Sequence, residues 1–260
     1  LDINEETMTE EFERLIEDGL QLAVAGCDFS SVGERWVSQK PPWDYTALLR
    51  QRLPGIDALL DMDTGGGELL ASLAPLPPDT WATEGYVPNI PEARGRLGPL
   101  GVHVVDAISD QPLPFPENRF DLVANRHGSF SGRELFRILR PGGLFLTQQV
   151  GGQDNFRLNE LLQDQPKYEF GDWTLEAMIQ ELTAGGLEIL SSQEAFPEER
   201  FYDIGAVVFY LRIIQWQIAD FSIEKYRPRL FALHEQIQRD GCLVTHGHRV
   251  LIEARRPPLA

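Results

Sequence analysis

Short apolar runs alternate with helical patterns of apolar residues from about residue 56 onward. The apolar runs predict five strands, at residues 56–62, 80–84, 102–105, 120–125 and 144–150. Apolar positions spaced three and four apart predict helices between most of these strands, at residues 68–73, 91–97 and 132–139. Such alternation is typical of βα units joined into a mainly parallel sheet with helices on its faces.

Helix-start signals and prolines mark the segments before this region. An amphipathic helix is predicted from Thr7 to about residue 25, with a capping box formed by Thr7 and Glu10. The prolines at 41 and 42 exclude a helix interior, and Asp44 is predicted to cap the helix that follows them.

The downstream half of the chain continues with helices and two more strands. A capping box of Ser131 and Glu134 precedes the helix at residues 132–139, and Pro141 with its following glycines is predicted to end it. Beyond the fifth strand the pattern predicts helices at 155–162 and 174–184, a strand at 187–191, two helices within 204–239 and a final strand at 249–254.

Composition excludes several classes of protein. Of the 260 residues 42% are hydrophobic, which is enough for a sizeable core and excludes general disorder. Forty acidic residues against 23 basic ones give a net charge of −17, and only three of the basic residues are lysines. Because binding to nucleic-acid phosphates needs a basic face, we expect no nucleic-acid partner.

Cysteine usage and hydropathy indicate a cytoplasmic protein. Cys27 and Cys242 give no disulfide framework and suit a reducing compartment. The opening residues are acidic where a signal peptide is basic, and the most apolar stretch, 204–218, contains Arg212 and is too short to span a bilayer. We therefore expect no membrane insertion. No metal site is predicted either, since a further ligand pair at zinc spacing does not accompany Cys242, His246 and His248.

The most informative stretch is the turn that follows the strand at 56–62, where three consecutive glycines, 65–67, lead into a helix. Such a turn brings backbone N–H groups close to a ligand, because glycine has no Cβ to block the approach. A dinucleotide fingerprint starting at Gly65 needs a sixth-position glycine, where Leu70 stands. A Walker phosphate loop is excluded as well, since no Gly-Lys-Ser/Thr follows and no lysine or arginine occurs between residues 53 and 93.

Acidic residues accompany this turn. Asp61 ends the strand before it, and Glu84 ends the next strand along the chain. A carboxylate at that second place can accept both hydroxyl groups of a ribose. The residues therefore favour an adenosine ligand without phosphates.

This set of features resembles the class I S-adenosylmethionine-dependent methyltransferases, whose first motif ends a strand with an acidic residue and continues with alternating glycines. The matching residues are Asp61, Gly65 and Gly67 in the first motif, Glu84 in the second, and Asp106 with Ala107 after the third strand, where the family usually contacts adenine. Residues 114–123 and 139–145 also resemble the family's entries into its fourth and fifth strands, so the likeness covers roughly residues 44–150.

The resemblance implies a fold and a cofactor. The fold is α/β, with a Rossmann-like seven-stranded mixed sheet, helices on both of its faces and an N-terminal helical cap. The family's last strand, here 249–254, lies antiparallel between strands five and six. The implied organisation is a cap over residues 1–43 and a methyltransferase domain over 44–260, its core at 44–150 and its C-terminal strands and inserted helices at 151–260. The implied cofactor is S-adenosyl-L-methionine.

One position departs from the family motif, because Asp63 replaces its first glycine. Aspartate tolerates unusual backbone angles better than most residues, and its carboxylate could pair with the ammonium of the cofactor's methionyl end. The same carboxylate could instead repel the methionyl carboxylate. We expect that Asp63 contacts the cofactor and that binding survives the replacement.

Residues after the fourth strand are candidates for the methyl-transfer side of the site. In the family a side chain from this place faces the methyl donor. His127 could act as a general base on the acceptor, or it could simply be hydrogen-bonded within a loop. Asn125 is expected to contact the cofactor or to form a pocket wall. Trp43 and Tyr45 could cover the sulfonium or anchor the preceding segment.

The function implied by the resemblance is transfer of a methyl group from S-adenosylmethionine. An acidic chain with additions that could roof a closed pocket favours a small-molecule acceptor. Two alternatives stay open: a non-catalytic protein that binds S-adenosylmethionine or S-adenosylhomocysteine, and an RNA or protein methyltransferase. The acceptor and the oligomeric state are not predicted.

Overall fold

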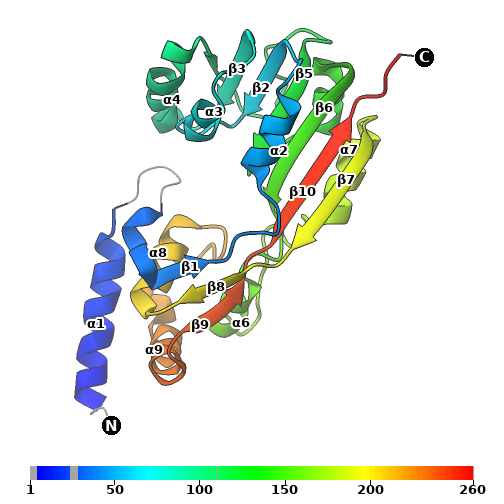
Figure 1. Cartoon of the computed structure of the whole chain (residues 1–260). Coiled ribbons are helices and arrows are strands. Elements are labelled where there is room, and N and C mark those ends of the chain that lie inside the picture. The colour runs from blue at the N-terminus through cyan, green and yellow to red at the C-terminus, as the bar shows by residue number, and fades with distance from the viewer. Residues whose placement is uncertain (1–4, 24–28, 110, 260) are drawn as a thin grey trace. The chain divides into compact units, whose positions relative to one another are not determined.

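Seven strands form the large sheet of the protein, in a computed structural model that describes residues 5–23, 29–109 and 111–259. Their order across the sheet is β4-β3-β2-β5-β6-β10-β7 (Figure 1). The strands are β2 (Ala58–Met62), β3 (Asp79–Glu84), β4 (His103–Asp106), β5 (Phe120–Arg126), β6 (Leu139–Val150), β7 (Glu188–Ala195) and β10 (Arg249–Arg255). The five strands from β4 to β6 pair in parallel, and β10 is antiparallel to both of its neighbours, β6 and β7. The expected mixed sheet and the antiparallel insertion of the last strand are confirmed.

Helices cover both faces of this sheet. One face packs against α2 (Tyr45–Arg52), α3 (Glu68–Ser72) and α4 (Ile90–Leu97), and the other against α5 (Gly132–Ile138) and α7 (Leu175–Ala184). The split follows from the alternation of side chains along a strand. In β2, Leu59 packs with the first helix group and Leu60 with the second, and every residue of the strand is buried. A strand buried on both faces needs the continuous apolar run that the sequence has there.

Side-chain caps begin several of these helices. Asp44 accepts a hydrogen bond from the Ala47 N–H at 2.9 Å, as predicted for the start of α2. At the start of α5 the Ser131 hydroxyl oxygen accepts from the Glu134 N–H at 3.5 Å, which is one bond of the predicted capping box. The Glu134 carboxylate does not make the return bond and instead accepts from the Leu113 N–H at 2.7 Å.

The start of β6 differs from the prediction. Helix α5 stops at Ile138, within one residue of its predicted end, but β6 begins at Leu139 and runs through the Pro-Gly-Gly segment, whereas the sequence predicts a strand only from residue 144. Two partners account for this start: Leu139 pairs with Phe120 of β5, and farther along Gly142 donates to the Arg256 carbonyl while Arg256 donates to the Gly143 carbonyl, both at 2.9 Å. The end of the chain thus extends the strand by several residues.

Contacts divide the chain into two compact units. The sheet unit comprises residues 42–151, 172–195 and 249–260, and the helical unit comprises residues 1–41, 152–171 and 196–248. The segment predicted as an N-terminal cap, residues 1–43, falls almost wholly in the helical unit, together with two later segments. The predicted domain over residues 44–260 contributes to both units.

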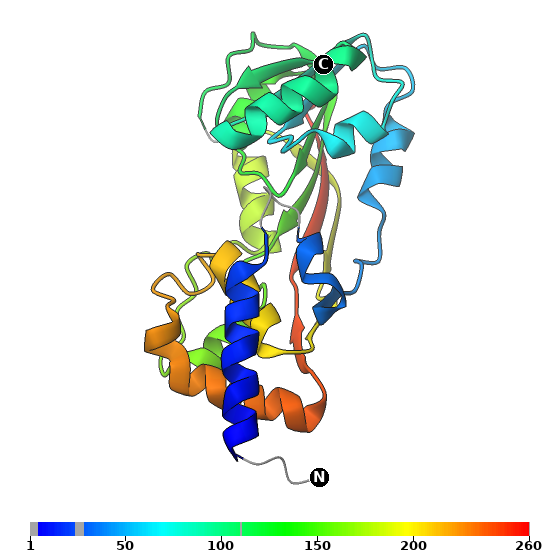
Figure 2. The ribbon, with the colours of Figure 1, turned by 90° about the vertical axis from the view of Figure 1, so that its left-hand side faces the viewer.

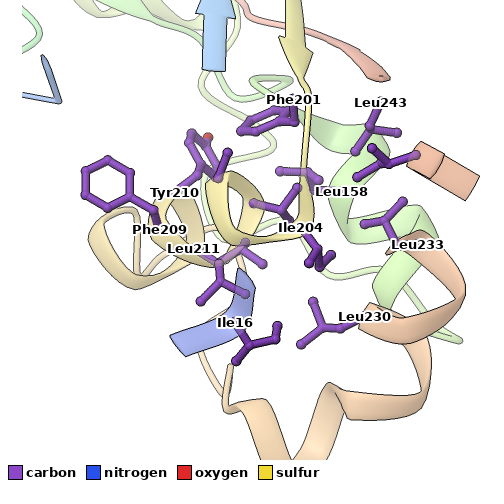
Figure 3. Close-up of a cluster of buried hydrophobic side chains, with 14 of the residues drawn as sticks. Ile16, Leu158, Phe201, Ile204, Phe209, Tyr210, Leu211, Leu230, Leu233 and Leu243 are labelled. Carbon is purple, nitrogen blue, oxygen red and sulfur yellow. The ribbon is translucent and has the colours of Figure 1, made fainter. Parts of the chain in front are cut away.

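The helical unit has a core of its own. It contains α1 (Glu5–Gln21), α6 (Phe156–Leu162), α8 (Ile204–Ile213) and α9 (Ile223–Asp240), with the short helix η1 (Ser30–Arg35). Residues 204–211 of α8 are all buried, and Figure 3 shows Ile204 and Leu211 near Ile16 of α1 and Leu230 of α9. The helical unit also has a small antiparallel sheet, which the sequence did not predict. Its strands lie in the order β1 (Trp36–Ser38), β8 (Glu198–Phe201) and β9 (Leu243–His246).

Helix α1, the blue helix in Figure 2, packs closely against α8. A Cβ added to Gly19 of α1 would overlap the carbonyl oxygen of Gly205 in α8. Because α1 already includes Glu5, Thr7 lies inside the helix and the predicted capping box with Glu10 is wrong. The helix ends at Gln21, before its predicted end near residue 25, and residue 25 itself lies outside the described residues. Among the described residues, the helices lack the combination of length and apolar character that crossing a membrane requires.

Candidate functional site

The glycine turn follows β2 and begins α3. Gly65 and Gly67 have φ angles of +63° and +84°, in the left-handed region that glycine adopts without strain. A Cβ on Gly67 would also lie 2.7 Å from Cγ of Leu97 in α4, so only glycine fits there. At Gly65 a Cβ would meet no atom within 4 Å, so the backbone there borders open space. The turn thus leaves room for a ligand beside Gly65.

Asp63 occupies a left-handed backbone position, with φ of +53°. This explains why a glycine suits the place in the motif and why aspartate, which tolerates that region, can replace it. Its N–H donates to Thr83 Oγ1 at 3.3 Å, and its carboxylate lies against the backbone of Gly128 after β5. The contact of Asp63 with a cofactor stays a prediction.

Glu84 binds the turn directly. Its side chain is buried, and Oε2 accepts from the Gly65 N–H at 2.7 Å while Oε1 accepts from the Tyr86 N–H at 2.6 Å. An ionised carboxylate has about four acceptor sites, so two bonds leave capacity for further donors. The turn and the acid, 19 residues apart in sequence, therefore form one site.

The next strand adds the predicted adenine side. Asp106 is in register with Glu84, and the N–H of Ala107 donates to the Glu84 carbonyl at 3.3 Å. Exposed apolar side chains follow the same two strands, with Tyr86 60% and Ile108 57% exposed. Sequence reasoning missed these two, although an apolar residue soon after a strand-ending acid was the available signal.

Asp61 lies behind the turn. Only 4% of the residue is exposed, and it accepts from Thr64 Oγ1 at 2.7 Å. Burial raises the pKa of Asp61 to about 7; the Thr64 hydrogen bond and the positive charge of Arg126 act against this rise, and the charges of Asp63 and Glu84 add to it. The contacts of Asp61 hold the loop from inside.

Arg96, which follows the stretch 53–93 that has no lysine or arginine, contacts the glycine turn. Arg96 of α4 donates to the Gly66 carbonyl and forms ion pairs with Glu68 at 2.5 Å and Glu92 at 3.2 Å. Sequence reasoning missed this contact because it looked for basic residues only between residues 53 and 93. With a carbonyl and two carboxylates as partners, the guanidinium is already engaged in the protein.

Asn125 belongs to a buried polar network at the ends of β5 and β6. Its Oδ1 accepts from Thr147 Oγ1 at 3.0 Å and from Gln149 Nε2 at 2.6 Å. Gln149 Nε2 also donates to the Gly128 carbonyl at 3.0 Å, which fixes the amide orientations and leaves Asn125 Nδ2 buried without a hydrogen-bond partner among the described residues. A buried donor of this kind is a place where a ligand or water is expected.

Tyr45 anchors α2 to the same strands. Its buried hydroxyl accepts from the Asn125 N–H at 3.1 Å and lies 2.9 Å from the Asn125 carbonyl and 3.1 Å from the Leu146 carbonyl, either of which can accept its proton. These contacts favour the anchoring role over covering a sulfonium.

His127 follows β5 in another left-handed position, with φ of +66°. Its N–H donates to the Gln148 carbonyl at 2.8 Å, and its Nε2 lies 3.2 Å from Gln148 Nε2. Trp43 Nε1 donates to Gln148 Oε1 at 2.8 Å. The pKa of His127 lies below its ordinary value, because surrounding protein displaces water from the imidazolium and because Arg126 and Arg249 repel it. The residue keeps substantial solvent exposure, so water moderates this effect.

The sequence-predicted site residues thus meet at the carboxyl ends of four neighbouring strands, β4, β3, β2 and β5. They are Asp61, Asp63, Gly65, Gly67, Glu84, Asp106, Ala107, Asn125 and His127. Strand order reverses between β2 and β5, and ligands of open α/β sheets bind at such a switch point. The ligand contacts themselves stay predictions.

A separate hollow of about 660 Å³ lies in the helical unit, lined by Tyr168, Trp216, Lys225 and neighbouring residues. None of the sequence-predicted site residues lines it.

Comparison with known proteins shows similarity in structure only. No family model and no curated protein sequence matches the chain. A protein of Bacillus halodurans C-125 assigned as a methyltransferase is 19% identical, with a TM-score of 0.59 over 82% of this chain and 98% of that one. The YcgJ protein of Bacillus subtilis is 16% identical, with a TM-score of 0.55 over 83% and 99% of the two chains. The [4+2]-cyclase SpnF is also 16% identical, with a TM-score of 0.53 over 96% of each chain. The chain therefore has the Rossmann-like fold of the class I S-adenosylmethionine-dependent methyltransferases.

Proposed function

We propose that this protein is an S-adenosylmethionine-dependent methyltransferase that acts on a small molecule. The observation that carries the proposal is the 2.7 Å hydrogen bond from the Gly65 N–H to the Glu84 carboxylate. It joins a left-handed glycine turn to a buried acid at the switch point of the sheet, where an adenosine without phosphates is the best chemical match.

The residues at this edge fit the proposed cofactor. The unused acceptor sites of Glu84 suit ribose hydroxyls, and the exposed side chains of Tyr86 and Ile108 offer apolar surface for adenine. The open space beside Gly65 leaves room for the rest of the molecule. Acidic residues at the ends of β2, β3 and β4 favour a donor that carries positive charge.

S-adenosylmethionine, when bound, supplies a methyl group activated by a sulfonium. The chain's own residues would then bind the cofactor and orient it toward the acceptor. Glu84 and the Gly65 backbone hold the nucleoside, while Asn125 and His127 border the side from which an acceptor approaches. Orientation and exclusion of water are the contributions that such a site can make.

A binding titration tests the cofactor assignment. Wild type is titrated with S-adenosylmethionine and S-adenosylhomocysteine by calorimetry, beside Glu84→Gln and the exposed control Glu176→Gln. We expect Glu84→Gln to weaken binding on the order of tenfold or more, because a charged acceptor for ribose hydroxyls is lost, and the control to bind like wild type. Absence of binding by wild type at millimolar ligand would reject the proposal.

The same titration on Asp63→Gly tests the motif departure. We expect wild type to bind, with the glycine variant binding equally or more tightly. Binding by the variant alone would show that Asp63 abolishes the cofactor site.

Turnover separates catalysis from binding, which matters because the same fold also occurs in a cyclase. Protein is incubated with methyl-labelled donor and, separately, a metabolite extract, total RNA and a protein fraction. We expect label in the small-molecule fraction. Label in RNA or protein would support the other methyltransferase class, and bound donor without any labelled product would support a non-catalytic binding protein.

A further inference from the structure

Gln148 has its side-chain orientation set by Trp43. An indole N–H can only donate, so the atom 2.8 Å from Trp43 Nε1 must be the amide oxygen of Gln148. The amide nitrogen of Gln148 then points the other way, toward His127. Both contacts lie within the sheet unit.

This orientation decides the protonation of His127. An amide nitrogen has hydrogens to donate and no lone pair to offer, so His127 Nε2, at 3.2 Å, has to accept. An imidazole that accepts at Nε2 is neutral and carries its proton on Nδ1. Gln148 also holds the backbone of His127, since its carbonyl accepts the His127 N–H at 2.8 Å.

The charges around the ring also favour the neutral form of His127. Arg126 of β5 and Arg249 of β10 both lower the pKa of His127, as does the surrounding protein. Arg126 and Arg249 thus place positive charge near His127. The carboxylates of the same site are Asp63, which lies against the backbone of Gly128, and Asp61, whose pKa Arg126 also lowers. A site that holds both signs of charge suits a cationic donor and an anionic acceptor.

We infer that Trp43 and Gln148 hold His127 as a neutral imidazole protonated on Nδ1, and that His127 binds an anionic oxygen of the acceptor as a hydrogen-bond donor instead of removing a proton. The acceptor class is a carboxylate, and this part rests on the proposed function. An oxygen lone pair of the carboxylate forms the bond to the methyl carbon as the sulfur–methyl bond breaks and sulfur keeps its electron pair. The products are a methyl ester and S-adenosylhomocysteine, and no proton is transferred, so the step needs no base.

Nitrogen NMR of histidine-labelled protein tests the tautomer without any ligand. The signals of His127 are assigned by their loss in His127→Gln. We expect Nε2 without a proton and Nδ1 with one, and no conversion to imidazolium between pH 8 and pH 5. A proton on Nε2, or titration with a midpoint near 6.5, would overturn the inference.

Two variants probe the positioning residues. In Gln148→Glu the carboxylate can only accept, so we expect the proton to move to Nε2 and the pKa of His127 to rise by at least about one unit. Trp43→Phe removes the donor that orients the amide, so we expect the Nε2-protonated form to appear. The exposed Gln193→Glu makes the same charge change on β7 and should leave the His127 signals in place. Unchanged His127 signals in both Gln148→Glu and Trp43→Phe would contradict the positioning role.

Label transfer tests the acceptor. With labelled donor, we expect small carboxylates to yield alkali-labile methyl esters at a rate nearly constant from pH 6 to pH 8. His127→Gln keeps an N–H donor and should retain the rate within about tenfold, whereas His127→Phe should lose more. A rate that falls below pH 7 only when His127 is present would show a base and refute the inference.

Failure to bind S-adenosylmethionine would refute the proposed function, whereas a wrong tautomer in a protein that binds it would refute this inference alone.

Discussion

Asp61→Asn tests the cost of the buried acid behind the glycine turn. The side chain is 4% exposed and its pKa is raised from 3.8 to about 7, mainly by burial. As pH rises above 3.8, the unfolded chain loses this proton first while the folded protein still holds it, so the folded state loses relative stability until pH 7 and the loss is constant above. At about 1.4 kcal/mol per pH unit, the full loss is about 4 kcal/mol.

Asparagine keeps the shape of the protonated acid and an oxygen that can accept from Thr64, but it does not titrate. Urea unfolding of wild type and Asp61→Asn, followed by circular dichroism at pH 5, 6, 7 and 8, measures the difference in free energy of unfolding. We expect this difference to shift in favour of the variant by about 3 kcal/mol from pH 5 to pH 8. Groups common to both proteins cancel in the difference.

The exposed Glu176→Gln serves as the matched control. Its carboxylate keeps its water in both states, so its stability difference should vary much less with pH. A difference between wild type and Asp61→Asn that stays constant within about 0.5 kcal/mol across the four pH values would refute the burial argument.

Two glycine substitutions probe the turn and its neighbour. Gly67→Ala forces a Cβ to 2.7 Å from Leu97 Cγ at a φ of +84°, so we expect a loss of at least about 2 kcal/mol in thermal unfolding, whereas Gly98→Ala, with nothing within 4 Å and a φ of −54°, should change little. Gly128→Ala places a methyl group against Asp63 Oδ2, so we expect weaker S-adenosylmethionine binding that the double variant with Asp63→Gly restores. Equal binding by Gly128→Ala and wild type would show that this contact is not fixed.

The strands and most helices of the sheet unit could be predicted because their signals are local. β2 is a continuous apolar run buried on both faces, and the helix after Asp44 starts with a cap that is visible in sequence. The glycine turn could also be predicted, because glycine adopts positive φ without strain, and both Gly65 and Gly67 have positive φ. The sequence did not predict that the Gly65 N–H donates to Glu84, and the binding of a cofactor by these residues stays a prediction.

Errors arose where a segment depends on a distant partner. The strand β6 begins early because Leu139 pairs with Phe120 of β5 and because Gly142 and Gly143 bond to Arg256, more than 100 residues away. The small sheet was missed because its strands are short and pair across the chain, as Trp36 does with Phe201. Runs of three or four residues carry too little periodicity to stand out.

The sequence by itself determined where strands and helices form and which acidic and glycine residues lie at strand ends, because hydrophobic period, caps and turn residues act over a few positions. Only the tertiary structure decided how those ends are used. It buries Asp61, turns Asp63 toward Gly128, and joins Trp43, Gln148 and His127 in one hydrogen-bonded set. Burial, charge and hydrogen-bond direction at a site depend on residues far apart along the chain, and the fold alone brings them together.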